Sequence, residues 1–286
     1  MEQEPSVRVE QELKFVGIHE HFVELLIGFE SINKVYSVKL CGMYFKMNLC
    51  DFRDALSLKA DQYSIPRCFP SISKDVECHM KNVYDITLIF QGCQKIIPND
   101  IHTSYNDNVF FVLGANGGGK TTYLRAIGVN LIFFSCGCPV FCDQALIFPP
   151  TKIYTHFPID ETYTSGRFDA EVLRLNEILK SADTGSWVFL NETFSGTNSY
   201  KGVISALDTM KKLKEQNVFC LFVTHFFELI NKGFPSLNVI IDKNGQNKRT
   251  FRVERSDFAK SSFSQDILKK YNLDFESLKT RYKSDF

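Results

Sequence analysis

The sequence has no excess charge of either sign, because 33 Lys and Arg residues balance 33 Asp and Glu residues. A chain without net charge has no overall basic field of the kind that holds nucleic acid non-specifically. Any contact with DNA therefore has to come from a local patch or from an assembly. The 286 residues, 44% hydrophobic and 23% charged, are typical of globular proteins and exclude the disordered and fibrous classes.

No apolar run reaches the roughly 20 residues that a membrane-spanning helix needs. The best run, 127–141, is interrupted by Asn130, Ser135, Gly137 and Pro139, so we expect a buried helix followed by a turn. No secretory signal pattern opens the sequence. The nine cysteines are odd in number and mostly lie in apolar runs, which is typical of reduced thiols. These features predict a cytoplasmic protein that does not contact membranes.

Three of the cysteines, Cys136, Cys138 and Cys142, lie within seven residues and allow a zinc site as one interpretation. A fourth ligand has no obvious source nearby, and zinc sites usually combine two separated pairs of ligands. Cysteine also serves as a small apolar residue at the end of a helix and in the following turn. We favour this second interpretation and predict no metal at these cysteines.

The first 60 or so residues show a helical pattern, because apolar residues recur at spacings of three and four. These residues are Phe15, Ile18, Phe22, Leu25, Leu26 and Phe29. A second, less regular helical pattern runs over 32–58, and Pro66 and Pro70 then interrupt it, which predicts a linker over about 63–84. We therefore divide the chain into a helical region with a linker, 1–84, and a second domain, 85–286.

From residue 85 onwards, short β-rich runs alternate with helical runs, and this alternation predicts an α/β fold with a mostly parallel sheet covered by helices. The expected strands lie at 85–91, 108–113, 152–157, 186–191 and 218–223, and the expected helices at 120 onwards, 168–179 and 200–214. Asn244 and Gly245 suit a tight turn between 239–242 and 250–253, which predicts a β-hairpin. A last helix is expected after Ser262.

The segment GANGGGKT, 114–121, fits the phosphate-binding pattern G-x-x-x-x-G-K-[ST] between the apolar run 109–113 and an expected helix. Glycines let backbone N–H groups close around phosphate oxygens at the positive end of a helix. In such a loop Lys120 reaches the β- and γ-phosphates of a nucleotide and Thr121 binds Mg²⁺. The predicted nucleotide-binding residues of this loop are Gly114, Ala115, Asn116, Gly117, Gly118, Gly119, Lys120, Thr121 and Thr122.

A second predicted strand ends at Asn191, which is followed by Glu192. Asn191 occupies the position that normally holds an Asp, so it offers an amide oxygen without charge. Charged hydrogen bonds contribute about 1.5–3 kcal/mol against roughly 1 kcal/mol for neutral ones, so we expect weaker coupling to Mg²⁺. Glu192 can polarise the attacking water. We predict Thr121, Asn191 and Glu192 as the residues of the Mg²⁺ site.

Thr224 and His225 follow a third predicted strand, 218–223. Parallel α/β sheets present side chains to ligands at the carboxyl ends of their strands. His225 is therefore a candidate sensor of the γ-phosphate. The predicted catalytic residues are Lys120, Glu192 and His225.

Several segments, in one order from about 85 to 265, together resemble the ATPase domain of the MutS DNA mismatch repair proteins. They are GANGGGKTTYLR (114–125), LNETFSGTNS (190–199) and FVTHFFEL (222–229), with shorter matches at PNDI (98–101) and SGRFDAE (165–171). The combination of Asn191 with the Thr-His-Phe segment at 155–157 is more similar to a divergent MutS-related branch than to the mismatch-repair type.

The resemblance implies an ABC-type P-loop ATPase that uses ATP and Mg²⁺ and forms a homodimer. Each composite site then takes its P-loop from one subunit and signature-like residues, here Ser165 and Gly166, from the other, although Ser165 stands one position before the family's signature serine. Ile97 and Pro98 would contact the adenine. The dimer seam after Glu192 would be lined by Ser195, Gly196, Thr197 and Asn198.

The family's mismatch-reading domain, connector and clamp are not found in this sequence. Phe22 and Glu24 match the Phe-x-Glu pattern of the wedge in the mismatch-reading domain. Phe22, however, lies on the apolar face of the helical pattern, so we expect its side chain to be part of the core. The first 60 residues could be a remnant of the lever helices. The sequence contains no Leu-Ser-Gly-Gly signature, so the transporter and SMC branches of ABC-type ATPases are disfavoured.

Two functions follow from these patterns. The first is a dimeric ATPase that hydrolyses Mg-ATP slowly in DNA transactions, with DNA and other mismatch-repair proteins as partners. The second is an ATP-gated dimerisation or DNA-binding switch in which Asn191 has removed most of the hydrolysis.

Overall fold

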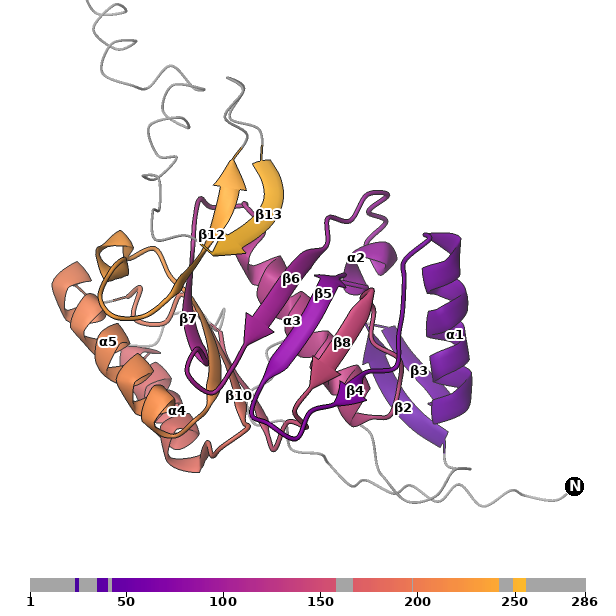
Figure 1. Ribbon diagram of the computed structural model, residues 1–286, viewed down its shortest axis with the longest axis horizontal. Helices are drawn as coiled ribbons and strands as arrows, with labels where there is room; N and C mark the ends of the chain where they lie inside the picture. Colours follow the sequence, from indigo (N-terminus) through magenta and orange to yellow (C-terminus); the bar gives the residue numbers. More distant parts are fainter. Residues whose placement is uncertain are drawn as a thin grey trace, which may run out of the picture.

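The computed structural model of the chain describes residues 24–25, 35–40, 43–157, 167–196, 198–241 and 249–255. Two sheets form its centre, a six-stranded one and a four-stranded one, and helix α3 (Lys120–Ser135) packs against strands of both (Figure 1). The larger sheet is mostly parallel, so the predicted α/β fold is confirmed. No helix in the described part of the chain is long and apolar enough to span a bilayer.

The six-stranded sheet has the order β13-β12-β7-β11-β10-β9, and its neighbours are parallel except for the β12–β13 hairpin. Its strands are β7 (Val109–Leu113), β9 (Ile153–His156), β10 (Trp187–Asn191), β11 (Phe219–Val223), β12 (Ser236–Ile241) and β13 (Arg249–Arg255). Every residue of β7, β10 and β11 is buried, as expected of parallel strands covered on both faces.

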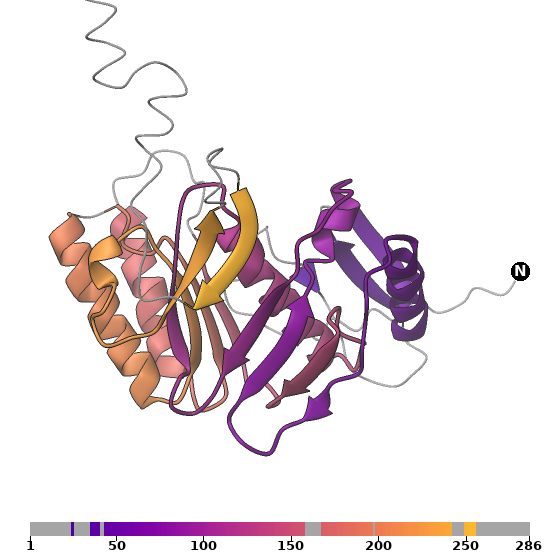
Figure 2. The ribbon, with the colours of Figure 1, turned by 45° about the horizontal axis from the view of Figure 1, so that its top comes forward.

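Helices α4 (Arg167–Ser181) and α5 (Ser199–Glu215) lie together on one face of this sheet, and α3 covers the other (Figures 1 and 2). Alternate residues of a strand point to opposite faces. Phe110 and Val112 of β7 accordingly pack in the core on the α3 side, whereas Val109, Phe111 and Leu113 pack in the core below α4 and α5. β7, β9, β10, β11, α4 and α5 lie within two residues of their predicted bounds, and α3 begins at its predicted residue, whereas β12 begins three residues before its predicted start.

The four-stranded sheet was not predicted and has the order β4-β8-β5-β6. Its strands are β4 (Ser71–Ile72), β5 (Cys78–Val83), β6 (Asn99–Thr103) and β8 (Gln144–Ile147). Cys78, Met80 and Val83 of β5 are buried in the core that α3 shares. The prediction of a linker over 63–84 is therefore wrong for 71–72 and 78–83, and β5 pairs with β6 and β8 across the predicted boundary at 84.

The short helix α2 (Thr87–Phe90) replaces the strand predicted at 85–91. Oδ1 of the buried Asp85 accepts hydrogen bonds from the backbone N of Thr87 at 3.1 Å and from its Oγ1 at 2.6 Å. An aspartate that accepts bonds from residues just after it favours a helical turn over an extended strand. The expectation of a strand is thus wrong because a polar side chain begins a helix here.

Residues 35–40 and 43–48 form strands β2 (Val35–Leu40) and β3 (Met43–Asn48) rather than the helix predicted over 32–58. Of the described residues in that range, only 49–58 are helical, within α1 (Leu49–Gln62). The register pairs Leu40 with Met43, Val38 with Phe45 and Tyr36 with Met47, so apolar residues alternate at directly opposed positions. This period of two outweighs the weaker helical pattern.

Other N-terminal and C-terminal expectations fall largely outside the described residues. Of the helical pattern over 15–29, only Glu24 and Leu25 are described, and they form strand β1, which pairs with β2. Phe22, the turn at 244–245 and the helix after Ser262 lie outside the described ranges. The hairpin that this turn was predicted to close is present as β12 and β13.

Candidate nucleotide-binding site

The phosphate-binding pattern folds as a glycine-rich loop that leads from the end of β7 into α3. Gly119 precedes α3 with a φ of 99°, and no side chain among the described residues caps the free N–H groups of this helix end. A Cβ atom on Gly118 would lie 2.9 Å from the carbonyl oxygen of Ala115, so the tight loop requires a glycine there. Uncapped N–H groups at a helix N-terminus suit an anion.

Lys120 is buried at the start of α3 and turns its side chain into the loop. Its Nζ donates to the carbonyl oxygens of Gly114 at 2.7 Å and Ala115 at 3.1 Å. Burial lowers the pKa of Lys120 to about 8, and the negative charge of Glu192 opposes part of this shift. No carboxylate in the described part of the chain forms an ion pair with this ammonium, so the loop fits an anionic ligand such as a phosphate.

Thr121 and Asn191 meet at the beginning of α3 and the end of β10. The hydroxyl of Thr121 donates to Oδ1 of Asn191 at 3.2 Å. Hydroxyl and amide oxygens are ligands that suit Mg²⁺, which usually retains several of its waters. The two side chains thus fit a Mg²⁺ site, but neither supplies charge.

Glu192 and His225 lie beside each other because β10 and β11 are parallel, with Asn191 opposite Val223. Nε2 of His225 donates to Oε1 of Glu192 at 2.7 Å. This hydrogen bond lowers the pKa of Glu192, so the side chain is a carboxylate at neutral pH. Both side chains are about one third exposed, which leaves the carboxylate open to water.

The backbone at Glu192 adopts a conformation that costs free energy. Glu192 has a φ of 54° and Phe194 a φ of 70°, in the left-handed region that non-glycine residues rarely adopt. The backbone N of Glu192 donates to the carbonyl of Val223 at 2.8 Å, which holds the turn against the end of β11. Such strain often marks functional positions, and here it sets the direction of the Glu192 side chain.

His156 was noted in the Thr-His-Phe segment, but sequence reasoning gave it no role in the site. It is buried at the end of β9, and burial lowers its pKa. Its Nδ1 lies 2.9 Å from Oγ1 of Thr193, and its Nε2 lies 3.0 Å from the carbonyl oxygen of Glu171. The carbonyl requires N–H at Nε2, so the neutral ring accepts from Thr193. His156 thereby fixes the turn after Glu192 against α4.

The segment around Ile97 is joined to β13, which lies over the P-loop. Ile97 itself is half-buried. Arg252 donates to the carbonyl oxygen of Pro98 at 2.7 Å, and the side chain of Asn99 bonds the carbonyl of Phe251 at 3.0 Å and the backbone N of Val253 at 2.7 Å. Nothing in the local sequence pattern indicated these contacts, because they join residues about 150 positions apart.

The predicted trans-acting residues are described only in part. Ser165, Gly166 and Thr197 lie outside the described ranges. Ser195, Gly196 and Asn198 are exposed after Glu192, and the side chain of Asn198 accepts from the backbone N of Tyr200, which caps α5. Asn116 is exposed in the loop, and Thr122 is half-buried in the first turn of α3.

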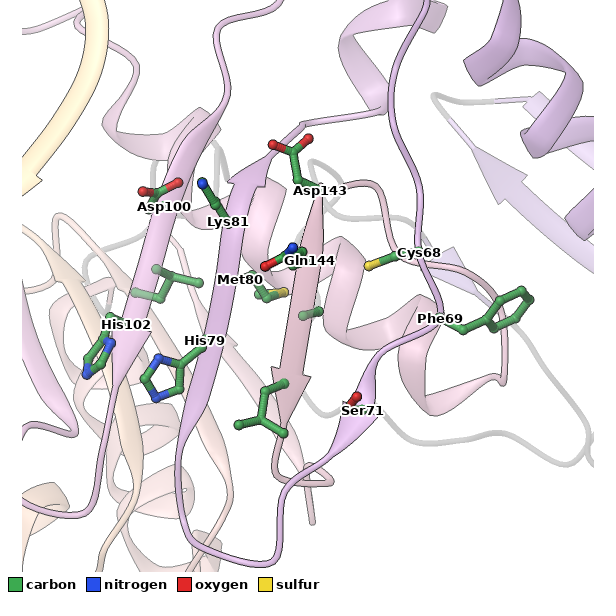
Figure 3. A pocket seen from close by; sticks show the side chains of 13 residues that line it. Cys68, Phe69, Ser71, His79, Met80, Lys81, Asp100, His102, Asp143 and Gln144 are labelled. Atoms are coloured by element: carbon green, nitrogen blue, oxygen red, sulfur yellow. The ribbon is translucent and has the colours of Figure 1, made fainter.

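Two other features lie apart from this site. Cys136, Cys138 and Cys142 are buried, and Sγ of Cys142 lies 3.6 Å from Sγ of Cys68. Among the described residues, no three His, Cys, Asp or Glu side chains gather as a metal site. A shallow groove crosses the outer face of the four-stranded sheet, past His79, His102 and Gln144, and contains none of the predicted site residues (Figure 3).

Comparison with protein families finds a match to MutS domain V over residues 110–263. The matched segment covers more than half of the 286 residues. It begins in β7 and contains the P-loop, the ends of β10 and β11, and the β12–β13 hairpin.

Proposed function

Because the chain belongs to the MutS domain V family, as its motifs predicted, we propose that it binds and hydrolyses Mg-ATP at the site formed by the ends of β7, β10 and β11. The observation that carries the proposal is the convergence of these three strand ends. The Thr121–Asn191 contact of 3.2 Å and the His225–Glu192 contact of 2.7 Å join residues that are 70 and 33 positions apart. Ligands of parallel α/β sheets bind at this edge.

In this proposal the P-loop binds the phosphates of ATP. The backbone N–H groups before α3 donate to phosphate oxygens, and Lys120 turns from the carbonyls of Gly114 and Ala115 to the β- and γ-phosphates. Thr121, Asn191 and Glu192 would hold Mg²⁺ with its waters. When bound there, the ion would supply positive charge next to the phosphates during transfer.

Glu192 acts on the attacking water, because its carboxylate is ionised and reaches solvent. It orients the water and accepts its proton, as a general base does. His225 is a positioning residue that donates to Glu192 and stands where it can sense the γ-phosphate. The left-handed backbone at Glu192 and the contact between Thr193 and His156 keep this carboxylate in place.

An ATP-gated switch with little or no hydrolysis is the second candidate function. Asn191 supplies a neutral oxygen where a carboxylate is usual, and its Oδ1 already accepts from Thr121. This observation favours long residence of ATP over fast turnover.

Dimerisation and DNA remain proposals that the family suggests. A homodimer would bring Ser165 and Gly166 of one subunit to the P-loop of the other. The exposure of Ser195, Gly196 and Asn198 beside Glu192 is compatible with a seam at this face. DNA, directly or through other mismatch-repair proteins, is the setting we propose, although the balanced charge of the chain gives no independent support.

ATP turnover by the purified chain with Mg²⁺ tests the proposal, together with Lys120→Ala, Glu192→Ala and sizing with and without ATP. We expect Lys120→Ala to lose ATP binding, and Glu192→Ala to keep binding but lose at least 100-fold in turnover, in the range for a general base. ATP-dependent dimers without turnover would support the switch. Absence of ATP binding by the unaltered chain would contradict both functions.

A further inference from the structure

Strand β13 carries a β-bulge next to the P-loop. Val239 of β12 pairs with Val253, but Ile241 pairs with Arg249, so residues 250–252 stand opposite the single residue Ile240. Phe251 has a φ of 56°, and Thr250 uses its hydroxyl twice, donating to the carbonyl of Ile240 and accepting from the backbone N of Arg252. Bulges bend a strand and change the direction of its side chains, and they are common next to active sites.

The bulge places two side chains against the P-loop. A Cβ atom on Gly117 would lie 2.8 Å from Nη1 of Arg249, and a Cβ atom on Gly119 would lie 3.3 Å from Cδ1 of Phe251. The guanidinium can lie this close only because residue 117 has no side chain. In Figures 1 and 2, the β12–β13 hairpin stands at the end of the sheet from which α3 begins.

The three arginines of β13 have different surroundings. Arg252 donates to the carbonyl oxygen of Pro98, and Arg255 pairs with Asp107, each at 2.7 Å. Arg249 is exposed and has no acidic partner in the described part of the chain. Its guanidinium therefore lies against the loop with donors available for another group. A guanidinium can donate two hydrogen bonds to two oxygens of one phosphate, which makes its binding more specific than that of an ammonium.

We propose that Arg249 is a further phosphate-binding residue, which β13 supplies to the P-loop of the same chain. It adds a second cation beside Lys120 for the phosphate chain of a bound nucleotide. This inference rests on the proposed nucleotide binding and extends it to a residue outside the P-loop motif.

Equilibrium titration with fluorescent ATP and ADP analogues tests the assignment in the full chain. We expect Arg249→Gln to lower the affinity for both nucleotide analogues by about 10- to 100-fold, which is the effect of losing one charged hydrogen-bonding group. Arg249→Lys keeps the charge and should recover part of the affinity. Arg255→Gln removes the same charge from the same strand away from the loop, and we expect it to stay within twofold of the unaltered chain.

The outcomes separate this inference from the proposed function. The proposal of nucleotide binding at the P-loop is itself contradicted if the unaltered chain binds neither analogue. It is also contradicted if the Lys120→Ala variant binds the analogues as tightly as the unaltered chain. If both behave as expected but Arg249→Gln binds equally well, the assignment of Arg249 is overturned. Tighter binding by Arg249→Gln also overturns it, because the guanidinium would then compete with the phosphates. A thermal melt of each variant without nucleotide verifies that Arg249→Gln and Arg249→Lys are folded like Arg255→Gln.

Discussion

We propose that Asn191 sets how strongly the site couples to Mg²⁺, so Asn191→Asp is the most direct test at the scale of one residue. The substitution places a carboxylate within hydrogen-bond distance of Thr121. A charged ligand holds a hard cation more strongly than an amide does. We expect turnover to rise by about tenfold and the Mg²⁺ concentration for half-maximal turnover to fall by a similar factor.

A Mg²⁺ titration of turnover measures this effect. Asn106→Asp is the matched control, because it makes the same change of charge at an exposed position between β6 and β7, at the other end of β7 from the P-loop. If the Asn191→Asp variant has the same Mg²⁺ requirement as the unaltered chain, residue 191 does not take part in Mg²⁺ binding.

The lowered pKa of Lys120 predicts that nucleotide affinity depends on pH. Burial brings the pKa to about 8, so the side chain is mostly charged at pH 7 and mostly neutral at pH 9. Phosphate binding requires the ammonium, so we expect affinity for the ATP analogue to fall by about tenfold from pH 7 to pH 9, since each unit above the pKa costs a factor of ten.

The stability of the nucleotide-free chain should change in the opposite direction. Lys120 keeps its proton up to its ordinary pKa when the chain is unfolded, so the cost of burying the charge disappears between about pH 8 and 10.5. Lys120→Arg is the control for affinity, because arginine stays charged over this range. Equal slopes of affinity against pH in Lys120→Arg and in the unaltered chain would assign the pH dependence to another group.

At the scale of elements, the sequence predicted the parts whose signal is local. Strands β7, β10 and β11 are short apolar runs, and the P-loop is one continuous segment of eight residues, 114–121. The ends of these strands could be assigned to one edge because parallel strands share direction. The pairing of Glu192 with His225 follows from that edge and from the register of β10 with β11.

Other elements depend on contacts between distant residues, so their local patterns were misleading or silent. The strands β4, β5, β6 and β8 contain polar residues on an exposed face, and β5 alternates buried Cys78 and Met80 with His79 and Lys81. The bulge of β13 is held by Asn99, which bonds Phe251 and Val253. No spacing within 249–255 contains that information, so Arg249 was missed.

At the scale of the whole molecule, the residue at which the domain that holds the P-loop begins is still a prediction. The proposed boundary at 84 would leave β6 and β8 without β5, which lies between them. Their backbone N–H and C=O groups would then lose partners, and a buried unpaired group costs about 1–3 kcal/mol. Leu56 and Ala60 of α1 and Ile65 are also buried in the core that α3 shares. We therefore propose that the domain that holds the P-loop extends upstream to α1 at least.

Two truncated chains distinguish these boundaries. We expect a chain of residues 49–286, which keeps α1 and the four-stranded and six-stranded sheets, to unfold cooperatively in urea. Its urea midpoint should lie near that of the full chain. A chain of residues 85–286 loses the central strand β5 and the core residues Cys78, Met80 and Val83. A typical domain has a free energy of unfolding of about 5–15 kcal/mol, and we expect this loss to exceed it. We expect the shorter chain to show no cooperative transition by circular dichroism. Equal urea midpoints for the two chains would instead place β5 outside the folding unit, and the boundary at 84 would then stand.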